Sequence, residues 1–218
     1  MTAPLALLRS RFASARSLSI QNEQLAMSTG IPGLALPRGA ITEVSGLASS
    51  GRTTFLCSVL AAATRRRESC AVIDTADTFD PASAEAAGAD LRFLLWVRCA
   101  ARKKYALQAA DWLLQAGGFG VVALDMANLA SRDVRNIPLN IWFRFRRAVE
   151  HKPTVLLAIA AEHCTGSAAA WQLEMSPRGA IWRGSINGSL LHGTAMAAIP
   201  RKPVSRQTAF EAQSCLLA

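Results

Sequence analysis

Residues 39–60 read GAITEVSGLASSGRTTFLCSVL and set the architecture expected for the whole chain. A β-branched run over residues 40–45 meets a loop of Gly, Ser and Ala, which opens into an apolar segment with helical periodicity. A strand, a loop and a helix in this order are typical of a phosphate-binding loop. The core of the segment, from Gly46 to Thr53, follows the spacing G-x-x-x-x-G-K-[ST] with one departure, because Arg52 stands where the motif has lysine.

The loop residues have separate roles in the expected phosphate site. Glycines permit positive φ angles, so that backbone N–H groups converge on a phosphate, and a threonine hydroxyl completes a magnesium shell. Arg52 can hold a phosphate through two nitrogens, but its planar group is larger than an ammonium. ATP or ADP with Mg²⁺ is therefore the candidate ligand, and efficient hydrolysis is not expected. On the motif alone, a Gly/Ser turn before a helix, without a bound nucleotide, stays open as the alternative. The expected nucleotide-binding residues are Gly46, Ser49, Ser50, Gly51, Arg52, Thr53, Thr54 and Asp125, with Thr53 and Asp125 nearest magnesium.

The composition predicts one α/β domain with extensions. The chain has 218 residues, of which 51% are apolar and 18% charged, so a sizeable core is expected and disorder is not. No apolar run approaches the roughly 20 residues of a membrane span, and the N-terminus lacks a signal peptide's apolar core. The five cysteines have no paired spacing, which predicts neither a zinc site nor disulfides. We expect a cytoplasmic protein without a membrane partner.

The net charge of +9, from 24 Lys and Arg against 15 Asp and Glu, indicates an anionic partner. Nucleic acid and an acidic protein surface both fit this charge. The alternative is that many arginines only solvate helix faces.

Strands and helices alternate along the first two-thirds of the chain, which predicts a mixed α/β sheet. Strands are expected over residues 40–45, 70–74, 94–97, 120–125 and 154–161, and helices over 52–66, 82–87, 103–116 and from about 138 to 150. The helix at 103–116 presents Tyr105 and Trp112 on its apolar face. Residues 171–175 and 180–183 alternate around Ser-Pro-Arg-Gly, which predicts a hairpin at the sheet edge. The domain boundaries are expected at 1–36 (N-terminal helix and connector), 37–195 (core) and 196–218 (basic, then polar tail).

Three segments resemble the RecA-like recombinase core: GIPGLALPRGAITEVSGLASSGRTT, AVIDTADTFDP and FGVVALDMANLA. The resemblance spans roughly residues 30–185 and implies a P-loop NTPase core, with a mostly parallel central sheet flanked by helices and a C-terminal β-hairpin. It implies that Asp125 ends the Walker B strand. Asp125 is then either a ligand of magnesium-bound water or a strand-end residue that caps the next turn.

The chain departs from the recombinase pattern at several catalytic positions. Ala76 stands where the family has the glutamate that activates water, and Asp77 is a weak substitute because neighbouring side chains on an extended segment point in opposite directions. Ala160 and Ala161 stand where a polar sensor is expected. Only residues 162–167 connect two strands where recombinases carry a long DNA-binding loop. Asp74 and Asp80 are expected to stabilise a turn and a helix entry.

A RecA-like core with these losses resembles the ImuA group of SOS-linked accessory proteins. The resemblance implies a non-catalytic protein of DNA damage tolerance in the bacterial cytoplasm, near the nucleoid. It implies partnership with an inactive Y-family polymerase homologue of the ImuB type, an error-prone polymerase and RecA, with weak, salt-dependent DNA contact. The alternative from a different class is a weakly hydrolysing ATPase that uses Arg52 for phosphate, Asp77 or Asp125 for catalysis, and binds DNA.

Three segments are candidates for partner contacts. An N-terminal amphipathic stripe is expected to dock on another copy, on RecA or on its own core, because a short helix is marginal in water without a surface to pack on. An arginine-bearing helix and the basic tail are candidates for the polymerase-like partner, and buried packing is the competing expectation for the helix's tryptophan. The residues are Leu5, Leu8 and Phe12 in the stripe; Trp142, Arg144, Arg146 and Arg147 in the helix; and Arg201, Lys202 and Arg206 in the tail.

Overall fold

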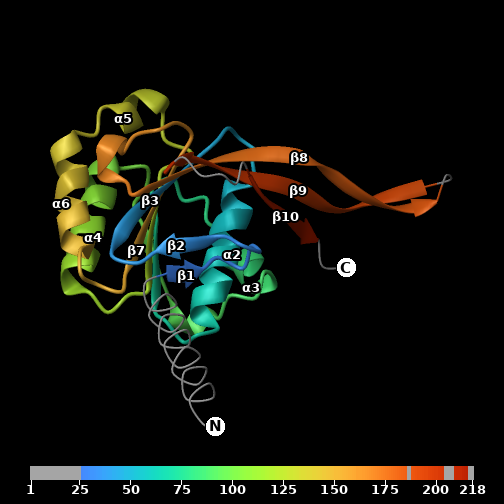
Figure 1. Cartoon of the computed structure of the whole chain (residues 1–218), viewed down its shortest axis with the longest axis horizontal. Coiled ribbons are helices and arrows are strands. Elements are labelled where there is room, and N and C mark those ends of the chain that lie inside the picture. The colour runs from blue at the N-terminus through green and yellow to red at the C-terminus, as the bar shows by residue number, and fades with distance from the viewer. Residues whose placement is uncertain (1–25, 186–187, 204–208, 216–218) are drawn as a thin grey trace, which may run out of the picture.

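The computed structural model describes residues 26–185, 188–203 and 209–215. An eight-stranded sheet runs through the molecule in the order β10-β9-β8-β3-β7-β6-β4-β5, and its six strands from β8 to β5 are parallel (Figure 1). Strands β1 and β2 form a separate antiparallel pair. The strands are β1 (Ala26–Ser28), β2 (Ala35–Pro37), β3 (Ala40–Ser45), β4 (Cys70–Asp74), β5 (Leu94–Arg98), β6 (Val121–Asp125), β7 (Val155–Ala160), β8 (Trp171–Ser185), β9 (Gly188–Lys202) and β10 (Phe210–Cys215).

Helices cover both faces of the parallel strands (Figure 1). The helices are α2 (Arg52–Thr64), α3 (Pro81–Ala86), α4 (Lys103–Ala116), α5 (Ser131–Arg135) and α6 (Leu139–Val149), with short 3-10 turns η1 (Leu91–Phe93) and η2 (Gly166–Ala168). On one face, Phe55 and Leu60 of α2 pack on Val44 and Val72 of the sheet. On the other face, α4 and α6 pack on the opposite side of the same strands. The central strands are therefore buried on both faces, which explains why β6 and β7 read as continuous apolar runs.

The structure confirms the predicted α/β architecture, and the predicted strands and helices of the core lie within two residues of the observed ones. The stretch before α6 forms the short helix α5. Helix α4 faces the sheet differently from the prediction, because it buries Ala106, Ala110 and Leu114 and leaves Trp112 exposed. Small side chains let this helix lie close to the sheet.

The C-terminal hairpin is longer than predicted. Residues expected to form its turn, Ser-Pro-Arg-Gly at 176–179, lie inside the continuous strand β8, where the pairing with β9 shifts between Pro177 and Gly179. An irregularity of this kind accommodates proline in the part of β8 that pairs with β9 alone, beyond the pairing with β3 that ends at Glu174. The pairing of β8 with β9 continues as far as Ser185 opposite Gly188. The two strands project well beyond the helical layers (Figure 1).

The sheet continues across the boundary expected at 195/196. That position lies inside β9, and β10 pairs with β9 in antiparallel register. Met196 and Phe210 belong to the same core cluster as α2. The end of the connector before residue 37 forms the β1–β2 pair, whereas the expected N-terminal helix with Leu5, Leu8 and Phe12 lies outside the described residues. No helix in the described ranges is long and apolar enough to cross a membrane.

Candidate phosphate-binding site

The loop between β3 and α2 has the backbone conformation that its glycines predict. Ser49 and Gly51 have φ angles of 60° and 96°. A Cβ added at Gly51 would lie 2.6 Å from the Met196 sulfur of β9, and one at Gly46 would lie 2.6 Å from the Ser50 hydroxyl. Close packing thus requires glycine at both positions. At position 51 the left-handed backbone also requires it.

A cavity of about 360 Å³ lies between this loop and the strands β8 and β9. Ser50 Oγ and Arg52 Nη1 are buried without a hydrogen-bond partner, and Arg52 is only 8% exposed. Burial lowers the pKa of Arg52, while the nearby Asp125 carboxylate raises it. Buried groups without partners are costly, and an anion is the complementary ligand for both. The loop therefore fits a phosphate group, with Thr53 exposed and Thr54 half-buried beside the cavity.

Asp125 lies at the carboxyl end of β6, directly opposite Asp74 of β4 in the sheet register. Its Oδ1 accepts a hydrogen bond of 2.9 Å from the Ala127 N–H, which is the capping geometry expected for a strand-end aspartate. Burial raises the pKa of Asp125; the Ala127 bond and Arg52 oppose the rise, and Asp74 adds to it. No cluster of three or more His, Cys, Asp or Glu suited to a metal occurs within the described ranges.

Asp77 is held in an ion pair, so its carboxylate is not free to act as a general base. Its backbone has a φ of 63°, and its two carboxylate oxygens accept hydrogen bonds from Nε and Nη2 of Arg98. The Arg98 guanidinium also lies 5.0 Å from the ring centroid of Trp96. The hydrogen bond from Arg98 lowers the pKa of Asp77. A carboxylate with a lowered pKa is a weaker proton acceptor, so Asp77 is poorly suited to replace the acid missing at Ala76.

Asp74 and Asp80 have the structural roles expected for them. The Asp74 carboxylate accepts hydrogen bonds from the Thr78 and Phe79 N–H groups at 3.1 and 2.9 Å, and it accepts a third from Trp96 Nε1 at 3.2 Å. Asp80 caps α3 by accepting bonds from the first N–H groups of that helix.

Sequence reasoning missed Glu43, a fully buried carboxylate in the middle of β3. It accepts hydrogen bonds from the Thr165 N–H at 3.0 Å and the Gln172 side-chain amide at 2.8 Å, and further bonds from the Cys164 N–H and His163 Nδ1. The short connection at residues 162–167 is therefore tied to β3. The available signal was an acidic residue inside a β-branched run. The sequence of the run does not show which residues bind this carboxylate.

The candidate partner-binding residues differ in their accessibility. Trp142 is fully buried and packs edge-on against Phe145, so it is a core residue and cannot anchor an interface; the exposed aromatic of α6 is Phe143. Arg144 forms an ion pair of 3.1 Å with Asp111 of α4.

Arg146 and Arg147 are exposed. Arg146 and Lys202 line one cavity of about 220 Å³, which brings the helix and the tail together. Arg201 pairs with Glu174 at 2.6 Å. Arg206 lies outside the described residues.

Comparison with known proteins matches residues 5–135 to the RecA N-terminal domain. The chain is 35% identical to Protein RecA of Rubrobacter xylanophilus over 113 residues, which cover 52% of this chain and 33% of that protein. It is 38% identical to Protein RecA of Rhodospirillum rubrum over 109 residues, 50% of this chain and 29% of that protein. The chain thus spans about a third of the length of the curated relatives it matches. With more than half of its residues matched, this chain belongs to the RecA N-terminal domain family.

Proposed function

We propose that this chain is a non-catalytic RecA-like accessory protein of SOS DNA damage tolerance. It scaffolds or regulates an error-prone translesion polymerase assembly through protein contacts. The observation that carries the proposal is the combination of a well-formed phosphate loop with missing hydrolytic groups. Ala76 has no carboxylate, and Asp77 is committed to Arg98. ATP turnover by such a site is expected to be near background, because Ala76 supplies no base for the attacking water and Arg98 holds Asp77.

The connection at residues 162–167 supports the same proposal. It is short, and Glu43 fixes Cys164 and Thr165 through their backbone N–H groups. A segment of this length and attachment offers little chain to wrap a DNA strand. DNA contact is then electrostatic, weak and strongly salt-dependent.

Nucleotide binding without efficient turnover is the second candidate activity. The buried Ser50 hydroxyl and Arg52 Nη1 without partners favour it, because a phosphate would satisfy both. In this case ATP or ADP stabilises the fold or a partner complex. Isothermal titration with ADP tests it, and Arg52→Ala should abolish the heat of binding if the loop holds the phosphates.

The proposed partners are an inactive Y-family polymerase homologue of the ImuB type, RecA, and a second copy of this chain. A pull-down with the purified polymerase homologue and with RecA, with and without ATP, tests the accessory role. Retention of neither partner would contradict the role. Arg146→Glu with Arg147→Glu should weaken retention of the polymerase homologue, because these arginines are exposed, whereas Arg132→Glu on α5 serves as the matched control.

The N-terminal stripe is proposed to mediate self-association or RecA contact. Leu8→Asp places a charge in this stripe and should weaken those associations without unfolding the core. Sedimentation and pull-down on the folded variant measure the effect. Unchanged association with every partner would leave the stripe as a cap on its own domain.

A further inference from the structure

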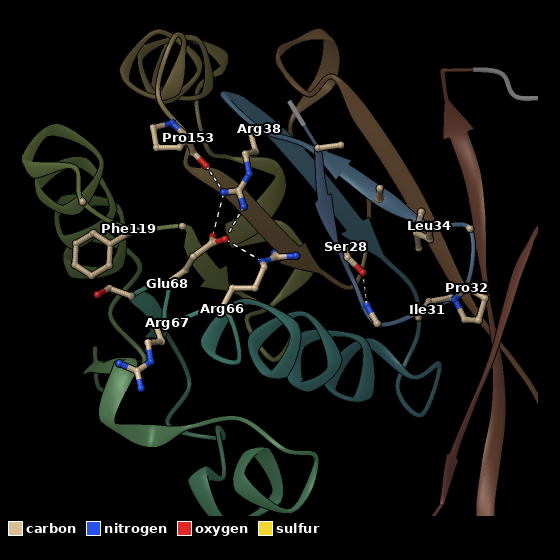
Figure 2. A pocket seen from close by; sticks show the side chains of 17 residues that line it. Ser28, Ile31, Pro32, Leu34, Arg38, Arg66, Arg67, Glu68, Phe119 and Pro153 are labelled. Atoms are coloured by element: carbon tan, nitrogen blue, oxygen red, sulfur yellow. Dashed lines mark hydrogen bonds and ion pairs between the residues drawn. The ribbon is translucent and has the colours of Figure 1, made fainter. Parts of the chain in front are cut away.

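A broad cavity of about 1460 Å³ opens at the end of the sheet opposite the phosphate loop. Residues that line it immediately precede parallel strands: Arg38 lies before β3, Ser69 before β4 and Gly120 before β6. The phosphate loop follows the carboxyl end of β3, so the two sites lie at opposite strand ends. Nothing in the proposed function uses this cavity, which we call the amino-edge groove (Figure 2).

The walls of the amino-edge groove are held firmly in place. One wall is the turn between β1 and β2, where the buried Ile31 and Leu34 anchor the loop in the core and leave Pro32 exposed. The Leu34 N–H donates to the Ile31 carbonyl at 3.1 Å, which closes the turn. Phe119 and Pro153 form the facing wall (Figure 2). The groove is therefore a preformed surface with apolar side walls.

Arginines outnumber acids around this groove. Arg38 donates to both oxygens of Glu68, at 3.1 and 2.7 Å, and Arg66 Nε donates to the same carboxylate at 3.0 Å (Figure 2). Arg67 also lines the groove and is exposed. Glu68 thus faces two guanidinium groups, and the exposed Arg67 adds a third positive charge to the lining of the groove. A guanidinium binds carboxylates through parallel hydrogen bonds.

Residues 1–16 of the chain are a poor match for this groove. Residues 1–16 contain Arg9, Arg11 and Arg16 and no acid, so their charge has the same sign as the arginines of the groove. Nucleic acid is also a poor match, because Phe119 is the one aromatic side chain among the described lining residues. Single strands are usually held by several aromatic platforms.

We propose that the amino-edge groove binds a short peptide segment of a partner protein in which acidic residues alternate with apolar ones. The apolar side chains pack on Pro32, Phe119 and Pro153, and the carboxylates pair with Arg66 and Arg67. This combines apolar burial with charge complementarity at the rim, which is the common composition of a protein interface.

Selection from a library of phage-displayed random dodecapeptides on the full chain tests this proposal. The expected result is enrichment of peptides that contain both acidic and apolar residues. One enriched peptide, synthesised with a fluorophore, is then titrated by fluorescence anisotropy. Arg66→Glu reverses a charge of the groove, and Ala35→Trp fills it from the exposed face of β2; each should weaken binding at least tenfold. Arg132→Glu, an exposed charge reversal on α5, should change the affinity less than twofold.

Four outcomes would overturn the proposal. These are no enrichment, enrichment of basic peptides, displacement of the bound peptide by a synthetic peptide of residues 1–25, or its displacement by a 16-nucleotide oligothymidylate at physiological salt. Circular dichroism of each variant establishes that folding is retained. The proposed accessory role is tested separately by ATP turnover and by the pull-down, so a failure here is distinguishable from a failure of that role.

Discussion

Replacing Glu43 by glutamine should destabilise the protein strongly, because this carboxylate is fully buried and fully used. Oε1 accepts from the Cys164 and Thr165 N–H groups, and Oε2 accepts from His163 Nδ1 at 3.2 Å and Gln172 Nε2 at 2.8 Å. The glutamine carbonyl keeps the two backbone bonds, but its NH₂ group faces the Gln172 amide, which is a donor, and the His163 ring, whose Nδ1 accepts in only one tautomer. The substitution therefore removes two bonds to a charged acceptor.

Each hydrogen bond to a charged group contributes about 1.5–3 kcal/mol, and removing a buried charge offsets part of that loss. We therefore expect a decrease in the free energy of unfolding of about 3 kcal/mol. For a chain of this length, that corresponds to a fall in Tm of roughly 6–12 °C. Amide hydrogen exchange at residues 162–167 should also become faster, because this connection loses part of its attachment to β3.

Differential scanning calorimetry and hydrogen exchange at pH 7 measure the two effects. Glu150→Gln is the matched control, since Glu150 is exposed, and it should change Tm by no more than about 2 °C. A Glu43→Gln variant with the Tm and exchange pattern of the control would refute this account of the connection.

Three further predictions concern titratable groups. Asp125→Asn keeps the hydrogen bond from the Ala127 N–H but removes a carboxylate whose pKa is raised by burial. Because of that raised pKa, the stability of the wild type falls as pH rises from about 4 through the raised value. The variant should therefore have a Tm a few degrees higher than the wild type at pH 7, as measured by calorimetry. Burial raises the pKa of Glu68, but Arg38 and then Arg66 lower it further than burial raises it, so stability that is present above about pH 4.3 should be lost as pH falls through the lowered pKa. In urea unfolding measured at several pH values, Glu68→Gln should reduce this loss of stability at acid pH. An unchanged loss would exclude the ion pairs of Glu68 as its cause. Burial raises the pKa of Cys57 to about 11 and of Cys70 to about 12. In a variant with Cys99, Cys164 and Cys215 replaced by serine, Ellman's reagent at pH 7.5 should therefore label these two thiols only after denaturation, and rapid native labelling would contradict their burial.

The core of the fold could be predicted from local patterns. β6 and β7 are buried on both faces, so they appear in the sequence as short apolar runs, and the phosphate loop has glycines where close packing and, at Gly51, a positive φ require them. Pairing over long sequence distances was harder to predict. Ser-Pro-Arg-Gly has local turn chemistry, yet pairing with β9 keeps it inside β8.

The candidate site was only partly predictable for the same reason. The loop and Asp125 follow from the motif, but the contact between Gly51 and Met196 joins segments far apart in the sequence. The ion pair of Asp77 with Arg98 and the partners of Glu43 also depend on tertiary packing. On α6, an aromatic next to the apolar stripe can be buried or exposed, and only packing against α4 distinguishes Trp142 from Phe143.

The amino-edge groove had no sequence signal, because its walls come from three distant segments. Pro32, Phe119 and Pro153 are unremarkable in their own local sequences. Only the turn with Gly30 and Gly33 was expected, as a connector before the first core strand.

ATP turnover by the purified full chain tests the central claim most directly. The rate is measured with and without single-stranded DNA and compared with that of Asp125→Ala, which removes the carboxylate at the end of β6. We expect the same near-background rate for both proteins, with no stimulation by DNA, because Ala76 provides no base and Arg98 holds Asp77. DNA-stimulated turnover that disappears in Asp125→Ala would contradict it.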